Sequence, residues 1–385
     1  MNILLISTLF PYSTQTKRIK TTYALYNFIK KWVKDNQVTV IRPYYRPNFK
    51  PFNSKVELKE NKIKLNNFKI VDIPVYRIPI IEKYFINNVV NYIKNEKIEY
   101  DIILSHLRDS IMFSYKIAGN FNKPFVAGIH YGDILRLKNP WYRYRFKKPI
   151  KKAAIIGCRS EAIKKQFEKY FPEFIDKVRI INSGIKKGLI EDKQFFEKKA
   201  EQIMKREKLI IFTASNFIER KNIHLNLKAL SMVDDNIDWE YEIAGDGPEM
   251  QYLKNLVKEL KLTKKVNFLG YLNNNDVLEK MKESDIFLMV SVPETFGLVY
   301  LEAMSKGSIV IGAKNWGIDG VIRDEYNGFL SDPYPENIYN KLKKIMKLKK
   351  NKNLKEIIHN QYKTINNFTS EKMAEKYLEI IKNRV

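Results

Sequence analysis

One stretch decides the fold of this chain: SVPETFGLVYLEAMSKG, residues 291–307. It follows an uninterrupted apolar run, IFLMV at 286–290, which is typical of a strand buried on both faces of a parallel sheet. The residues after Gly297 predict a helix that ends before Gly307, because glycine is common just past a helix C-terminus. The run SIVI at 308–311 predicts the next strand. The stretch therefore predicts a strand, helix, strand unit of an open α/β sheet.

Two glutamates in this stretch suit the binding of a nucleotide. Glu294 comes just past the predicted strand, at the edge where open α/β sheets bind ligands, and the unpaired N–H groups of the next helix suit a diphosphate there. Gly297 lets the backbone approach an anion. Glu302, one turn into the helix, can accept hydrogen bonds from the vicinal hydroxyls of a ribose. The alternative is that Glu302 pairs with Lys306 and that Glu294 is an ordinary loop residue.

Length and composition indicate a globular protein of two domains. The chain has 385 residues, 44% of them hydrophobic and 13% aromatic, which argues against disorder. Its one cysteine, Cys158, excludes an internal disulfide and favours a reducing compartment. Residues 1–7 predict a first strand rather than a signal peptide, and no apolar run approaches the roughly 18 residues that cross a bilayer. We therefore expect a cytoplasmic protein whose membrane contact, if any, is peripheral.

The net charge is +26 and the sequence pI is 9.7, which favours anionic neighbours. Anionic lipid, nucleic acid and phosphate-bearing substrates all fit this charge. A coding bias toward lysine, asparagine and isoleucine is a further explanation.

Strand and helix patterns alternate twice along the chain. Residues 1–186 predict a first domain, in which 42–47 are too rich in proline for either element. The charged segment 187–208 predicts a linker, and the pattern restarts over 209–367. Two strands of the first domain end in histidines, His106 and His130. A structural hydrogen bond is the expected role of His106, because a lone histidine at a strand end is more often structural than catalytic.

The spacing from Glu294 to Glu302, with Phe296 and Gly297 between them, resembles the donor-binding motif of retaining, GT-B-type glycosyltransferases of group 1, similar to family 4. The resemblance implies two Rossmann-like domains facing a cleft, and a final helix of about 368–385 that packs back on the first domain. It implies that the first glutamate contacts the transferred sugar, the second holds the ribose, and the backbone between them binds the diphosphate.

The same resemblance extends to other parts of the chain. The family carries an Arg and, five residues later, a Lys that bind the diphosphate; here Asn216 stands at the Arg position, Lys221 matches the Lys, and Arg220 is its neighbour. The family also places a His facing the donor sugar. The catalytic residues so implied are Glu294, His130 and Lys221. The donor-binding residues so implied are Glu302, Asn216, Arg220, Thr295, Phe296, Gly297, Leu298 and Gly245, the last within a Gly-Asp-Gly-Pro element.

The most distinctive basic stretch of the first half is KNPWYRYRFKKPIKK, residues 138–152. Its aromatic residues suit a lipid headgroup boundary, and its basic residues suit anionic heads. Single-stranded nucleic acid would fit the same pattern, and so would a solvated helix face with some core aromatics. The residues that we expect at a membrane or acceptor contact are Trp141, Arg143, Arg145, Lys147 and Lys148.

By this resemblance we expect a hexosyltransferase-type enzyme that moves a sugar, with retention, from a UDP- or GDP-linked donor to a saccharide or lipid-linked acceptor. We expect it to act in bacterial envelope polysaccharide synthesis, at the inner face of the cell membrane. A nucleotide-sugar epimerase of the same fold is one alternative, and a non-catalytic nucleic-acid-binding or partner subunit is another. The sequence has no Asp-x-Asp pair and no metal-spaced Cys/His cluster, so we expect no metal and no cofactor beyond the nucleotide-sugar substrate.

Overall fold

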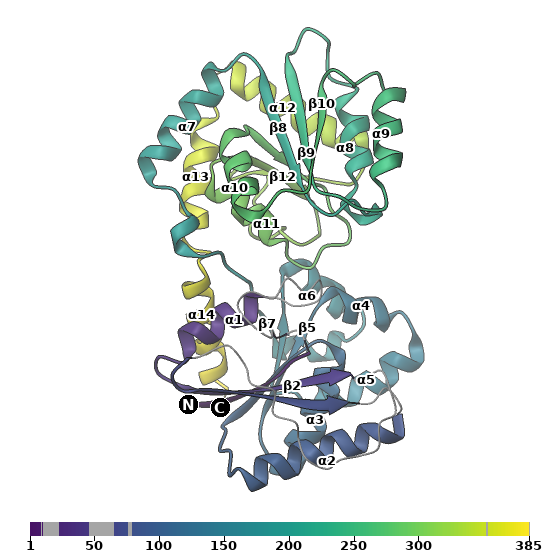
Figure 1. Cartoon of the computed structure of the whole chain (residues 1–385), viewed down its shortest axis with the longest axis vertical. Helices are drawn as coiled ribbons and strands as arrows, with labels where there is room; N and C mark the ends of the chain where they lie inside the picture. The colour runs from purple at the N-terminus through teal and green to yellow at the C-terminus, as the bar shows by residue number, and fades with distance from the viewer. Residues whose placement is uncertain (9, 11–22, 46–64, 76–78, 352, 385) are drawn as a thin grey trace. The chain divides into compact units, whose positions relative to one another are not determined.

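The structure is a computed structural model that describes residues 1–8, 10, 23–45, 65–75, 79–351 and 353–384. The chain divides into two compact units (Figure 1). The N-terminal unit comprises Met1–Arg159, Ile163–Asn182 and Ser370–Val385, and the C-terminal unit comprises Ser160–Ala162 and Ser183–Thr369. Among the described residues, no helix is both long enough and apolar enough to span a bilayer.

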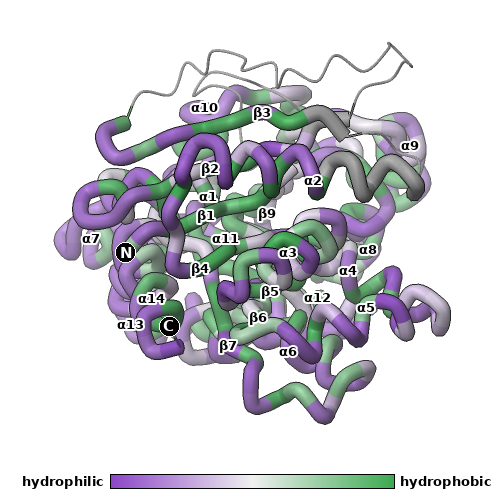
Figure 2. The backbone as a smooth tube through the Cα atoms, turned by 90° about the horizontal axis from the view of Figure 1, so that it is seen from below, coloured by the Kyte–Doolittle hydropathy of each residue, from purple (hydrophilic) through white to green (hydrophobic). Residues whose placement is uncertain are grey.

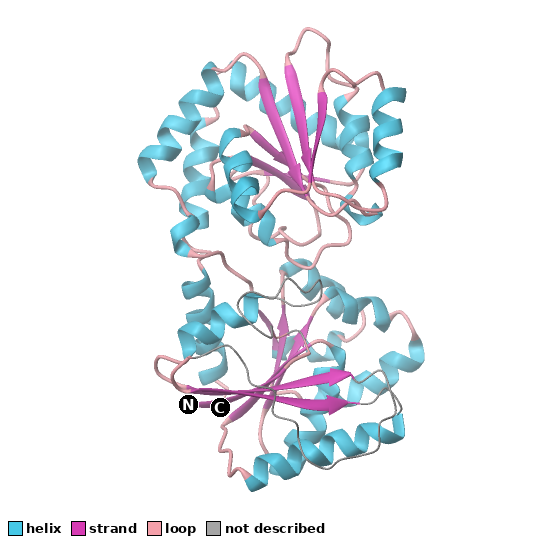
Figure 3. Cartoon of the chain, viewed as in Figure 1, coloured by secondary structure: helices cyan, strands magenta, loops and turns pink. Residues whose placement is uncertain are grey.

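The N-terminal unit is built on a seven-stranded parallel sheet in the order β3-β2-β1-β4-β5-β6-β7 (Figure 3). Its strands read as near-continuous apolar runs because helices cover both faces of a parallel sheet. Every residue of β4 and β5 is buried. The strands are β1 (Asn2–Ile6), β2 (Gln37–Tyr45), β3 (Phe68–Val75), β4 (Ile102–His106), β5 (Phe125–Ile129), β6 (Ile155–Cys158) and β7 (Val178–Ile180).

The helices of this unit connect the parallel strands, and the last helix of the chain joins them. Trp32 donates a hydrogen bond from Nε1 to the Ala374 carbonyl at 2.8 Å, which ties the first helix to the last. The helices are α1 (Tyr23–Trp32), α2 (Pro79–Asn95), α3 (Arg108–Phe121), α4 (Tyr131–Leu137), α5 (Pro140–Lys152), α6 (Glu161–Glu168), a 3-10 helix (Pro172–Lys177) and α14 (Ser370–Lys382). Helix α5 is coloured mainly hydrophilic in Figure 2, whereas strand β1 is coloured hydrophobic.

The expectation that residues 42–47 form no regular element was wrong for its described part. Strand β2 continues to Tyr45 and includes Pro43, which pairs with Ile73 of β3. Pairing with β1 stops at Ile41. Beyond that point β2 has a strand on one side only, so the missing N–H of the proline leaves no gap in the β1–β2 ladder.

The C-terminal unit is built on a six-stranded parallel sheet in the order β10-β9-β8-β11-β12-β13. Its strands are β8 (Leu209–Ala214), β9 (Trp239–Ala244), β10 (Val266–Gly270), β11 (Ile286–Leu288), β12 (Ile309–Ala313) and β13 (Phe329–Ser331). Its helices are α7 (Lys193–Lys205), α8 (Ile223–Leu230), α9 (Met250–Glu259), α10 (Asn274–Glu283), α11 (Leu298–Ser305), α12 (Pro335–Lys350) and α13 (Lys355–Ile365), with 3-10 helices at Lys187–Leu189 and Glu219–Lys221. Two parallel, helix-covered sheets confirm the predicted α/β class with two Rossmann-like domains.

The segment 187–208, expected as a linker, is part of the C-terminal unit. Helix α7 occupies most of it and buries Phe196, Ala200 and Ile203 in the core of that unit. These three residues recur at a helical spacing, so they form one apolar face among charged neighbours. The segment was expected to be a linker because its overall composition is highly charged, and composition alone does not reveal an apolar helix face.

Candidate active site

The central motif lies where the strand order of the C-terminal unit reverses. Strand β8 is flanked by β9 on one side and β11 on the other, and the chain proceeds outward from each. Ligands of open α/β sheets bind in the crevice outside the carboxyl ends of the strands at such a switch point. The loop carrying Lys221 follows β8, and Glu294 follows β11. Neighbouring strands therefore bring these two loops to one edge of the sheet.

Two cationic side chains converge on the Glu294 carboxylate. Lys221 Nζ lies 2.8 Å from Glu294 Oε2, and Arg220 Nη1 lies 3.1 Å from the same oxygen. Ser291 Oγ is 3.3 Å from that oxygen, and the Thr295 amide donates to Glu294 Oε1 at 3.1 Å. Such charge-assisted bonds hold the carboxylate in one orientation.

Burial and charge act in opposite directions on this cluster. The side chains of Glu294 and Lys221 are only 14% and 11% exposed. Burial alone would raise the pKa of Glu294, but the charges and hydrogen bonds of Lys221 and Arg220 hold it below the ordinary value. Burial lowers the pKa of Lys221 against the opposing effect of Glu294. Glu294 is therefore a buried carboxylate paired with cations, which is unlike an ordinary solvated loop residue.

Glycines shape the backbone around Glu294. Gly297 has φ of 82° and precedes α11, and a Cβ there would lie 2.4 Å from the Tyr300 ring. Both the positive φ and the close ring therefore favour glycine. Gly317 donates its N–H to the Glu294 carbonyl at 3.2 Å, and a Cβ on it would lie 2.8 Å from Glu294 Cγ. The sequence interpretation assigned no role to Gly317 or to Ser291.

Glu302 lies on α11 and is partly buried. Burial raises the pKa of its carboxyl group. Among the described residues, none forms a hydrogen bond or ion pair with that carboxylate. The alternative pairing with Lys306 was wrong, because Lys306 Nζ instead contacts Glu191 Oε1 at 2.8 Å. A partly buried carboxylate of this kind can accept hydrogen bonds from ligand hydroxyls.

The loop after β8 orients Arg220 and Lys221 rather than Asn216 toward Glu294. Asn216 is exposed, and its side chain has no hydrogen bond to Glu294. Asn222 adopts φ of 53° and donates from Nδ2 to the Val290 carbonyl at 2.8 Å, which ties this loop to the motif. The same strand edge brings Gly245 close to the loop, where a Cβ would lie 1.8 Å from the Ser215 carbonyl oxygen.

His130 belongs to the N-terminal unit, where it follows β5 and precedes α4. Its backbone N–H donates to Asp133 Oδ2 at 2.9 Å, and its Nε2 lies 3.4 Å from His106 Nδ1. Burial, and then the charge of Arg159, lower the pKa of His130 to about 3. The ring is therefore neutral at pH 7.

The basic stretch forms helix α5, and its aromatic residues divide between core and surface. Tyr142 and Phe146 are buried, whereas Trp141 is 64% and Tyr144 is 79% exposed. Arg145 lies over the Trp141 ring at 4.8 Å. Two of the remaining predicted contacts are engaged within the unit: Arg143 lies over the Tyr170 ring at 5.7 Å, and Lys147 Nζ pairs with Glu173 at 2.8 Å.

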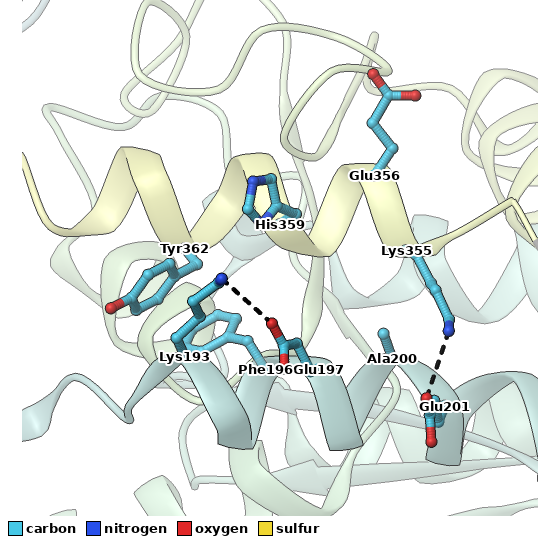
Figure 4. A pocket seen from close by; sticks show the side chains of 9 residues that line it. All are labelled: Lys193, Phe196, Glu197, Ala200, Glu201, Lys355, Glu356, His359 and Tyr362. Carbon is cyan, nitrogen blue, oxygen red and sulfur yellow. Dashed lines mark hydrogen bonds and ion pairs between the residues drawn. The ribbon is translucent and has the colours of Figure 1, made fainter.

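A separate groove of about 450 Å³ lies between α7 and α13 (Figure 4). Phe196, Ala200 and Tyr362 line it together with charged side chains, two pairs of which form ion pairs. None of the predicted site residues lines this groove. Among the described residues, no cluster of three or more His, Cys, Asp or Glu side chains could hold a metal ion.

Comparison with known proteins places this geometry in a family. The model of the family described as glycosyl transferases group 1 matches residues 194–364, and that described as Glycosyltransferase Family 4 matches residues 22–187. The chain belongs to the group 1 glycosyltransferases. Together the two matches include the predicted positions in both units.

Individual relatives of this glycosyltransferase are distant. An uncharacterized glycosyltransferase of Methanocaldococcus jannaschii is 26% identical over 251 residues, which is 62% of this chain and 63% of the relative. The N-acetyl-alpha-D-glucosaminyl L-malate synthase of Bacillus anthracis is 34% identical over 151 residues, which is 38% of this chain and 39% of that enzyme. The matches therefore span less than two thirds of either relative.

Solved structures share the fold over the whole chain. The crystal structure of HepE from Anabaena in complex with UDP has a TM-score of 0.71 and 17% identity, and each chain is covered completely. At that identity the likeness establishes the fold only.

Proposed function

We propose that this glycosyltransferase moves a sugar from a UDP- or GDP-linked donor to a hydroxyl of a saccharide or lipid-linked acceptor. The observation that carries the proposal is the cluster of Lys221, Arg220 and Glu294 at the switch point of the C-terminal sheet. Glu302 supports it, because its carboxylate has no partner among the described residues. The HepE structure supports the nucleotide class, since that protein was solved with UDP.

Each group has a role that follows from its chemistry. Glu302 would accept hydrogen bonds from the ribose hydroxyls, and Glu294 would orient the transferred sugar. Lys221 and the amides at the start of α11 would bind the diphosphate. Negative charge grows on this diphosphate as its bond to the sugar breaks, so fixed cations and amides there stabilise the transition state more than the ground state.

We propose that transfer retains the anomeric configuration. The bond from the anomeric carbon to the diphosphate oxygen breaks, and the acceptor oxygen forms a new bond on the same face. The proton of the acceptor hydroxyl passes to the departing phosphate. His130, which is neutral at pH 7, would contact the sugar as a hydrogen-bonding group rather than as a charge.

Arg220 is the second cation that we propose for the diphosphate. The family resemblance places an Arg at the position of Asn216, but Asn216 is exposed and Arg220 contacts Glu294. Loss of Arg220 should therefore weaken nucleoside diphosphate binding, whereas loss of Asn216 should not. Titration calorimetry on Arg220→Gln and on Asn216→Ala compares the two assignments directly.

We propose that the protein meets its acceptor at an anionic membrane surface, in the synthesis of a bacterial envelope polysaccharide. The support is the exposed pair Trp141 and Tyr144 on a helix rich in lysine and arginine. Such a helix face suits headgroups, with each basic residue near the surface worth about 1 kcal/mol. Flotation with anionic vesicles tests the proposed membrane contact separately. A protein that does not float with the vesicles would contradict it.

An activity assay tests the proposed reaction. We would incubate the protein with UDP- and GDP-sugars, with and without lipid-linked saccharide acceptors, and follow release of nucleoside diphosphate together with the product anomer by NMR. Acceptor-dependent release supports transfer. Conversion of the donor without an acceptor would favour an epimerase, and steeply salt-dependent oligonucleotide binding without donor turnover would favour a nucleic-acid-binding subunit.

A further inference from the structure

The two central strands of the C-terminal sheet stop pairing just before the candidate site begins. Pairing between β8 and β11 ends at Phe212 and Phe287. Each strand still pairs with its outer neighbour, β8 with β9 as far as Ala214 and β11 with β12 as far as Leu288. The ladder between β8 and β11 therefore does not extend to the two loops that follow these strands, although the candidate site takes side chains from both loops.

Side chains make the next contacts between the two halves of the site. Asn226 of α8 donates from Nδ2 to the Leu288 carbonyl at 3.2 Å, and the Thr213 hydroxyl donates to the same carbonyl. Asn222 donates from Nδ2 to the Val290 carbonyl at 2.8 Å. Asn222 is the N-cap residue of α8 and Asn226 lies about one turn later, so the two amides contact alternate carbonyls of one segment.

The contacts continue along this segment as far as Glu294. The Val292 N–H donates to the Arg220 carbonyl at 2.8 Å. Beyond it, Lys221 and Arg220 reach the Glu294 carboxylate at 2.8 and 3.1 Å. Every second residue from 288 to 294 is thus bonded to β8, to α8 or to the loop between them. The asparagine contacts come first after the sheet, so they determine how the later contacts, including the ion pair, line up.

Stability alone does not explain an asparagine at position 226. Asn226 is fully buried, and its Oδ1 has no hydrogen-bond partner among the described residues. Such an acceptor loses the hydrogen bonds that water would give it, and a leucine of similar size would avoid this loss. What the asparagine adds is a donor to the Leu288 carbonyl and to the Tyr241 hydroxyl, both at 3.2 Å. These bonds fix an orientation, which an apolar side chain could not do.

We propose that Asn222 and Asn226 are positioning residues that align the loop of Lys221 with the segment of Glu294. A buried ion pair needs good geometry, because poorly placed charges do not offset their loss of water. Placement also matters for the proposed reaction, since a displacement of about 1 Å in an active site can lower the rate roughly 100-fold. The effect on catalysis rests on the proposed function, whereas the alignment of the ion pair does not.

Hydrogen exchange tests the alignment without any ligand. Asn222 has φ of 53°, which glycine adopts without strain, so Asn222→Gly removes the amide and leaves the backbone path open. Lys221→Met removes the cation of the ion pair, and its effect is the loss of exchange protection in peptides from β8 to β12. We expect this loss to be at least about threefold smaller in the Asn222→Gly background than in the wild type. Equal losses in the two backgrounds would overturn the proposal.

Asn226→Leu tests the second asparagine through activity and stability together. We expect kcat to fall about tenfold and KM for the donor to change less than about threefold, because Lys221 is proposed to act mainly on charge that develops in the transition state. The melting temperature should stay within about 4 °C of the wild type, since the leucine also removes the unpaired acceptor. A lower melting temperature with an unchanged kcat of the folded protein is what a merely structural role predicts, and it would refute the proposal.

Asn122→Gly is the matched control. Asn122 also has a positive φ, of 49°, but it caps α3 in the N-terminal unit, so its replacement should change neither kcat nor the effect of Lys221→Met on exchange. Failure of the wild type to bind any nucleotide would refute the proposed function, and the exchange experiment would still decide the alignment. If exchange shows the coupling but both asparagine variants keep the wild-type kcat, the catalytic part of the proposal is refuted.

Discussion

Replacing Lys221 by Met should destabilise the C-terminal unit in a pH-dependent way. The substitution keeps the aliphatic stem but leaves Glu294 as a mostly buried carboxylate without its nearest cation, 2.8 Å away. Breaking a fully buried ion pair costs roughly 3–5 kcal/mol. Here Arg220 stays at 3.1 Å, and Ser291 and the Thr295 amide still face the carboxylate. We therefore expect a loss of about 2 kcal/mol at pH 7.5.

The sign of the pH dependence follows from Glu294. In the wild type its pKa lies below the ordinary value, so its ionised form contributes stability above the unfolded pKa, and this is lost as pH falls. In Lys221→Met the positive charge of Lys221 no longer opposes the effect of burial, so the pKa of Glu294 rises. Protonation of Glu294 at lower pH then removes the unpaired buried charge. The difference between the variant and the wild type should therefore shrink between pH 7.5 and pH 4.5.

Hydrogen exchange in rising urea, followed by mass spectrometry on peptides from β8 to β12, measures the free energy of opening in this unit. The double variant Lys221→Met with Glu294→Gln should recover part of the loss, since no buried charge is left unpaired. Lys344→Met is the control, because its side chain is 48% exposed where it pairs with Glu325, and it should change stability by less than about 1 kcal/mol. A loss that is equally large at both pH values would refute the argument.

Three further predictions concern the motif and helix α5. Gly297→Ala should cost about 1–3 kcal/mol in thermal unfolding, because it adds strain at φ of 82° and a clash with Tyr300, whereas Gly132→Ala, with open space around its Cβ, should be neutral or stabilising. Glu302→Gln should stabilise the protein at pH 8, and the gain should fade toward pH 4, because burial raises the pKa of Glu302 and so penalises its ionised form. A gain that grows as pH falls would contradict this. Trp141→Ser should reduce flotation with anionic vesicles without altering nucleotide affinity; unchanged flotation would argue against the membrane face.

Local patterns were sufficient to predict the motif. Three local features could be predicted because each depends on residues that are neighbours in sequence: the apolar run before Ser291, the turn at Gly297 and the helix that ends before Gly307. The predicted strand was longer than β11 itself, which ends at Leu288, although Met289 and Val290 remain buried. Burial and hydrogen-bond pairing end at different residues here.

Contacts between residues that are far apart in the chain could not be predicted from the sequence. Which cation reaches Glu294 depends on the path of the loop after β8, where the Val292 N–H donates to the Arg220 carbonyl at 2.8 Å. Spacing in the sequence gave no means to choose between Asn216 and Arg220. The contact between His106 and Tyr377, 271 residues apart, likewise depends on where the last helix packs. Helix α7 was missed because its charged residues outnumber the three apolar residues that it buries in the core.

The central claim is that this chain binds a nucleotide through Glu302. Titration calorimetry with UDP, GDP and ADP on the wild type and on Glu302→Gln tests it most directly, because the amide keeps the shape of the side chain and removes its charged acceptor. We predict that one nucleoside diphosphate binds the wild type and that the variant binds it at least about tenfold more weakly, equivalent to a loss of about 1.4 kcal/mol. Equal affinity in the two proteins, or no binding of any nucleotide to the wild type, would contradict the account.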